Sequence, residues 1–309
     1  MKKIEVQLDT YKGYKTEQDN DLISIELEVG FDPGTVERRK IWEFLKNNSL
    51  VTEGIYPTNP AILKAIVKYF KEKYPEMEEF SLDGGGIEAN IPPMCLELHK
   101  EIAQQKLILN YLNELKEFGF SDEVLSAGIH LNLDYNMLGN NQKEKQKTIK
   151  NLCLFTYQNI DFMVNMSQRK RGAQRLADMY SFLGDVCNQN GSEENFTEFL
   201  IHKNFLIDFF STDSAYDSHL SVFNLHVGKK GRKALEIRWF GPTLDLFKYY
   251  VILEFGHSLI IFCKTTDKKL TEENFKSFIT QNSNKYSNLF EYFKLPLKQE
   301  NNGRSRSNN

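Results

Sequence analysis

Apolar and polar side chains alternate with a period of two in several short segments of the chain, and this pattern predicts β-strands. The predicted strands cover residues 3–8, 21–30, 80–91, 124–134, 218–228 and 233–240. Other stretches repeat apolar residues at helical spacing. These predicted helices cover residues 60–73, 95–118, 143–165, 173–186, 196–210, 243–263, 271–283 and 286–294. Strands and helices mix without the regular rhythm of a parallel sheet, so we predict an α+β fold.

Four of the predicted strands carry an apolar face and an opposite face of ionisable or amide side chains. The polar faces hold Glu26 and Glu28, then Glu88 and Asn90, then Gly128, His130, Asn132 and Asp134, and finally Glu236 and Arg238. Glu26 and Glu28 lie two residues apart, which places their side chains roughly 7 Å apart along the strand. Two carboxylates so placed repel each other unless a cation or a base lies between them.

Each of these patterns has an ordinary explanation when it is taken alone. A polar strand face can simply be solvated, Glu26 and Glu28 can be charges on an edge strand, and Glu236 with Arg238 can form a weak surface ion pair. The glycines at 84–86 can form a plain turn. On one sheet, however, several carboxylates, an imidazole and a guanidinium indicate a metal–phosphate site, because carboxylates and phosphates bind Mg²⁺. The imidazole extends the choice to Mn²⁺.

Composition narrows the class of protein. The 309 residues include 39 basic and 42 acidic ones, a net charge of −3, which leaves no electrostatic signature of nucleic-acid or anionic-membrane binding. Four widely spaced cysteines favour a reduced, cytoplasmic protein. The N-terminus lacks the apolar core of a signal peptide. The apolar stretch 247–263 is interrupted by Glu254 and His257, which suits a buried helix better than a membrane span.

Four motifs occur in a fixed order: "IELEVG", "DGGGIEANIPP", "SAGIHLNLD" and "ALEIRWFGPTLD". This order resembles the amidoligase family, a branch of the superfamily that contains glutamine synthetase and glutamate–cysteine ligase. The resemblance runs from about residue 21 to about residue 250. It implies a curved, mostly antiparallel sheet of the glutamine synthetase catalytic type, with helices on one face and with ATP and Mg²⁺ or Mn²⁺ on the other. We expect a single catalytic domain over 1–297, followed by a polar tail over 298–309 whose lack of apolar residues predicts disorder.

The resemblance assigns roles residue by residue. It implies that the metal is bound by Glu26, Glu28, Glu88, His130 and Glu236. Arg238 matches the phosphate-side arginine of a Glu-x-Arg motif, and a further phosphate-binding arginine is expected among Arg169, Arg171 and Arg175, with Arg171 the first choice. Asp83, beside the three glycines, is our hypothesis for the group that deprotonates an incoming ammonium. Residues 136–145 or 188–195 are the segments we expect to cover the site.

The chain departs from the family pattern at three points. Asn132 stands where the family has a second histidine that faces the nucleotide, so it can donate a hydrogen bond there but carries no charge. The "DGGG" segment lacks the usual serine, and Pro242 is inserted into the Gly-Thr turn. These departures bear on nucleotide affinity more than on metal binding.

Three classes of function follow. The first is an ATP-dependent ligase that joins the carboxylate of an amino acid or peptide to an amine through an acyl phosphate. The second is a phosphotransferase on the same kind of sheet. The third is a catalytically inactive binding or structural protein, for which Asn132 is the main reason. The sequence selects neither the acid nor the amine, and it leaves the oligomeric state open.

Overall fold

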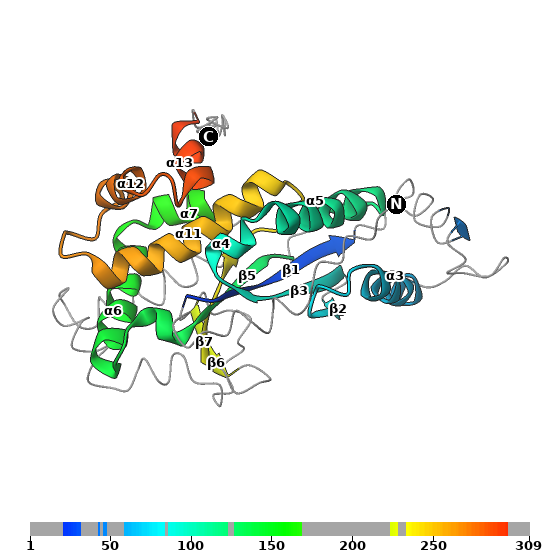
Figure 1. Cartoon of the computed structure of the whole chain (residues 1–309), viewed down its shortest axis with the longest axis horizontal. Helices are drawn as coiled ribbons and strands as arrows, with labels where there is room; N and C mark the ends of the chain where they lie inside the picture. Colours follow the sequence, from blue (N-terminus) through cyan, green and yellow to red (C-terminus); the bar gives the residue numbers. More distant parts are fainter. Residues whose placement is uncertain are drawn as a thin grey trace, which may run out of the picture.

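A computed structural model describes residues 21–31, 59–83, 86–122, 127–168, 223–227 and 233–295, with the isolated positions 43, 46 and 47. The described helices lie beside one antiparallel sheet whose strands differ in length (Figure 1). This is an α+β arrangement, as predicted. The predicted segments 3–8, 173–186 and 196–210 lie outside the described residues, as do the loop 188–195 and the polar tail 298–309.

The described strands form one seven-stranded sheet in the order β2-β3-β1-β5-β7-β6, with the short β4 pairing with β1. The strands are β1 Ile23–Phe31, β2 Glu79–Asp83, β3 Gly86–Met94, β4 Phe120–Ser121, β5 Ile129–Asp134, β6 Phe223–Val227 and β7 Lys233–Phe240. Every pairing between them is antiparallel. Predicted strand 80–91 is therefore two strands, β2 and β3, which pair with each other.

The helices follow the predicted segments closely. They are α3 Asn59–Lys73, α4 Leu96–His99, α5 Ile102–Glu117, α6 Gln142–Gln158, α7 Ile160–Ser167, α11 Leu246–Thr265, α12 Glu272–Gln281 and α13 Ser287–Lys294. Two predicted helices are each broken once, 95–118 between α4 and α5 and 143–165 between α6 and α7. Residues 136–145, expected to cover the site, instead form part of the 3₁₀ helix η1 Tyr135–Leu138 and the start of α6, with Met137 and Leu138 fully buried.

One face of the sheet packs against helices. Ile25, Leu27, Ile129 and Leu131 are at most 1% exposed. Helix α11 lies on this face (Figure 1), so close that a methyl group added at Gly256 would stand 2.3 Å from Leu131 Cδ1. At the other end of the sheet, aromatic rings of α3, α5 and β2 meet, as the Phe70 and Phe80 centroids lie 5.8 Å apart. Alternation therefore leaves the polar side chains of the same strands on the opposite face.

Among the described residues, α11 is the one helix long and apolar enough to span a membrane, but 78% of its apolar window is buried inside the protein. Its Glu254 is fully buried and accepts a hydrogen bond from the backbone N–H of Leu289, at 2.8 Å, in the first turn of α13. Lys100 lies 2.7 Å from the same carboxylate. Helix α11 is thus a core helix, as the sequence predicts, and its buried carboxylate holds α13 against it.

Gly86 allows β3 to approach β1 closely. A Cβ atom at this position would stand 2.0 Å from the backbone oxygen of Val29, so a side chain does not fit there. Among the glycines 84–86, which could have formed a plain turn, this one is therefore required by strand packing.

We predict that Gly256→Val destabilises the protein by about 1–3 kcal/mol, because the added methyl groups overpack the contact with Leu131. Unfolding in urea measures the change. Leu131→Ala opens the space, so the double variant should lose less stability than the two single variants added together. Additive losses would mean that the Gly256–Leu131 contact does not set the spacing of helix and sheet.

We also predict that stability falls as pH drops from about 6.5, the usual pKa of histidine, toward 4. Burial lowers the pKa of His99 to about 4 and the pKa of His257 to about 3. Both side chains are therefore neutral in the folded protein, while the unfolded chain takes up protons below pH 6.5. The His99 shift alone corresponds to roughly 3 kcal/mol of lost stability.

The matched variant is His99→Gln, because a glutamine amide keeps a donor for the Ile23 backbone oxygen that His99 Nε2 bonds at 2.9 Å. The slope of unfolding free energy against pH gives the number of protons taken up on unfolding. Between pH 6 and 5 this number should be smaller by about one in the variant. An unchanged slope would contradict the assignment of that proton to His99.

Candidate metal centre

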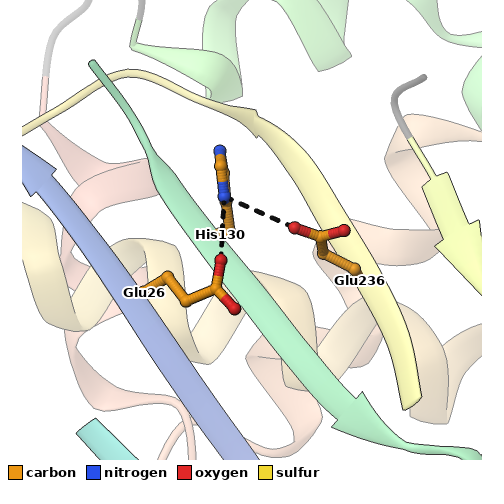
Figure 2. Close-up of side chains that lie close together, drawn as sticks. All are labelled: Glu26, His130 and Glu236. Carbon is orange, nitrogen blue, oxygen red and sulfur yellow. Dashed lines mark hydrogen bonds and ion pairs between the residues drawn. The ribbon is translucent and has the colours of Figure 1, made fainter. Parts of the chain in front are cut away.

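Three adjacent strands bring Glu26, His130 and Glu236 together on the polar face of the sheet (Figure 2). Glu26 on β1 is the direct cross-strand partner of His130 on β5, and Glu236 on β7 is the partner of Asn132, two residues further along β5. Because β5 is paired on both sides, its imidazole lies between the carboxylates of its two neighbours. The sequence predicted that these residues share a face, and the register places them side by side.

The ring nitrogen Nδ1 of His130 is the point on which the carboxylates converge. It lies 3.2 Å from Glu26 Oε2 and 3.4 Å from both Glu28 Oε1 and Glu236 Oε1. The imidazole is only 2% exposed. Ligand atoms of Glu26, His130 and Glu236 all lie within 4.8 Å of one another. Among the described residues, these three side chains form a group with the spacing that a metal ion would require.

These distances fit a small divalent cation. Neighbouring ligands of an octahedral ion with bonds of about 2.1 Å stand about 3 Å apart, and the ring nitrogen lies 3.2–3.4 Å from the three carboxylate oxygens. The donor set of carboxylate oxygens and one imidazole nitrogen suits Mg²⁺ or Mn²⁺. An imidazole nitrogen can bind carboxylates directly, as a protonated donor. Alternatively, its lone pair can bind the same cation as the carboxylates, and a nitrogen that binds a metal must be in this unprotonated form.

A β-bulge in β7 stands directly opposite His130. Ile129 pairs with Phe240 and Leu131 with Ile237, so the two residues Arg238 and Trp239 face the single residue His130. A bulge bends its strand and changes where nearby side chains point. Here the bulge includes Arg238 and begins two residues after Glu236, whose carboxylate lies 3.4 Å from the imidazole nitrogen.

Arg238 stabilises the carboxylate of Glu236. Its Nη1 donates to Glu236 Oε1 at 2.7 Å, and both side chains are largely buried. Its buried Nε has no hydrogen-bond partner among the described residues. Arg238 therefore combines one bond to the candidate metal centre with a further N–H donor that is buried.

On the polar face, Asn132 and Asn90 each donate to one glutamate. Asn132 Nδ2 lies 2.9 Å from Glu26 Oε1, and Asn90 Nδ2 lies 2.7 Å from Glu88 Oε1. The sequence placed Asn90 on the correct face but gave it no role. The signal was available, because a Glu-x-Asn pair places an amide and a carboxylate on the same side of one strand.

The other predicted site residues are placed less centrally. Glu28 is 8% exposed and reaches His130, whereas Glu88, its cross-strand partner, lies beside it but outside the close group of three. Asp83 is the last residue of β2 and its backbone pairs with Gly86, but its side chain is outside what the structure describes. Arg169, Arg171 and Arg175 lie outside the described residues.

Comparison with models of protein families and with curated proteins finds no match to the chain.

We predict that Glu26→Gln weakens Mn²⁺ binding strongly, because it removes a charged oxygen from the close group. Glu88→Gln is the matched control on the same face and should weaken binding less. Titration followed by the electron paramagnetic resonance signal of free Mn²⁺ measures both. Equal affinities for Glu26→Gln and the unmodified protein would contradict the site.

Proposed function

We propose that the protein is a cytoplasmic, ATP-dependent carboxylate–amine ligase that forms an amide bond through an acyl phosphate. The single observation that carries the proposal is the convergence of Glu26, His130 and Glu236, from three strands, beside the guanidinium of Arg238. The order of the four motifs, which resembles the amidoligase family, is the reason for assigning this arrangement to ligase chemistry. The proposed substrates are an amino acid or peptide that supplies the carboxylate and a second molecule that supplies the amine.

The fold is compatible with the proposal. An antiparallel sheet with helices against one face and ionisable side chains on the other is what a glutamine synthetase-like catalytic domain requires. In the described part of this chain, α3, α5 and α11 lie on the apolar side while the candidate metal centre lies on the polar side. We propose that this domain extends over residues 1–297.

The chemistry explains why such a site needs both kinds of charge. An amine does not displace the oxygen of a free carboxylate, so ATP must first phosphorylate that oxygen, with release of ADP, to give an acyl phosphate that can lose phosphate. A bound Mg²⁺ or Mn²⁺ would offset the charge of the ATP phosphates. The proposed role of Glu26, Glu28 and Glu236 is to hold the cation with charged oxygens, and that of His130 is to do so with a neutral nitrogen.

Arg238 has the complementary role. Its guanidinium is fixed by Glu236 and would stabilise negative charge on the phosphoryl group during its transfer to the substrate carboxylate. A second arginine from Arg169, Arg171 or Arg175 would act with it. Asp83 is the proposed acceptor of a proton from the incoming ammonium. The resulting amine attacks the acyl carbon, phosphate leaves, and the nitrogen releases its second proton to water to give the amide.

The direct test is incubation with ATP and Mg²⁺ against pools of amino acids and peptides, with mass spectrometry for a condensation product. We expect ADP release that depends on both an acid and an amine. ADP release with a phosphorylated product and no need for an amine would identify a phosphotransferase instead. Absence of both ATP and Mg²⁺ binding would identify an inactive member of the fold.

We predict that ATP and Mg²⁺ stabilise the protein together more than either does alone, because the phosphates complete the coordination of the cation. Saturation at 100 times the dissociation constant adds roughly 2.7 kcal/mol, which thermal melts detect. His130→Ala should abolish the synergy. If ATP alone stabilised the protein as much as ATP with Mg²⁺, the metal-dependent site would be refuted.

A further inference from the structure

Asn132 is bonded to the candidate metal centre without belonging to its close group of ligands. It follows His130 by two residues on β5, so both side chains lie on the polar face. Its Nδ2 donates to Glu26 Oε1 at 2.9 Å, and the side chain is only 7% exposed. Its contact therefore reaches the centre through Glu26.

The bond orients the carboxylate of Glu26, so that one oxygen is bound by Asn132 and the other faces the imidazole. Oε1 accepts from Asn132, while Oε2 lies 3.2 Å from His130 Nδ1. A glutamate side chain has three rotatable bonds, and fixing one oxygen limits where the other can be. With Asn132 in place, Oε2 is held toward the point on which the three ligand atoms converge.

Proximity alone does not explain this choice of partner. Asn90 is the residue directly opposite Glu26 across the β1–β3 pairing, yet its amide donates to Glu88, at 2.7 Å. Asn132 is opposite Ser24 and Glu236 and reaches Glu26 diagonally. The two amides are thus divided between two carboxylates, and only Asn132 bonds a member of the close group.

We propose that Asn132 is a positioning residue that orients Glu26 for binding of a divalent cation; this inference rests on the metal centre of the proposed function. A neutral amide suits the task, because it orients the carboxylate and leaves its negative charge available to the cation. An ammonium or guanidinium in the same place would compete with the metal for that charge. Outer hydrogen bonds of this kind typically change metal affinity by about 10- to 100-fold.

The test is a double-mutant cycle on Mn²⁺ affinity, measured by titration with the electron paramagnetic resonance signal of free Mn²⁺. Asn132→Ala should weaken binding by about 10- to 100-fold. In a protein that already carries Glu26→Gln, the same substitution should change affinity by no more than about twofold, because the orientation it controls no longer matters. Asn90→Ala, the matched control, should change affinity less than Asn132→Ala does.

Two results would overturn the proposal. One is an unchanged Mn²⁺ affinity in Asn132→Ala, and the other is an equal loss with and without Glu26→Gln, which marks a general structural effect. Circular dichroism checks folding, and Asn132→Ser, whose short side chain cannot span the distance to Glu26, replaces any variant that does not fold. If the unmodified protein binds no Mn²⁺, the proposed function itself fails, whereas binding that is insensitive to Asn132 refutes only the positioning role.

Discussion

The register of β5 between β1 and β7 is the constraint on which the rest of the structure depends. Because side chains alternate along a strand, a slip of one residue would turn His130 and Asn132 toward the helices and expose Leu131. The strand is held on both edges by antiparallel pairing. Its apolar face packs against α11, where Gly256 leaves room for Leu131. The same contacts that bury the apolar face therefore place the imidazole between its two carboxylate neighbours.

Much of this arrangement could be predicted from the sequence, because alternation and helical spacing are local. The predicted strand 233–240 coincides with β7, and the predicted helix 271–283 contains α12. The breaks between α4 and α5 and between α6 and α7 were harder to predict, since they depend on tertiary contacts. At the junction of α6 and α7, Asn159 donates from its side chain to the backbone oxygen of Leu270, and this distant partner leaves no periodic signal. Residues 136–145 looked like a loop because their buried Met137 and Leu138 are too few to show a period.

The residues of the candidate site could also be predicted in part from the sequence. The sequence assigned Glu26, Glu28, His130 and Glu236 to polar faces, and these four meet around one ring nitrogen. It did not separate Glu88 from them, because the separation depends on strand order and register rather than on spacing along one strand. Nor did it predict the bulge at Arg238 and Trp239, which exists only relative to the partner strand.

Three carboxylates of the polar face accept hydrogen bonds from donors of different charge. Glu26 and Glu88 accept from the neutral amides of Asn132 and Asn90, while Glu236 accepts from the charged guanidinium of Arg238. An amide orients a carboxylate and leaves its charge intact, whereas a guanidinium neutralises part of it. Asn132 and His130 of β5 thus each bind one oxygen of Glu26, whereas Glu236 is bound by Arg238 of its own strand. The positions of both carboxylates relative to the imidazole therefore depend on the pairing of β5 with β1 and β7.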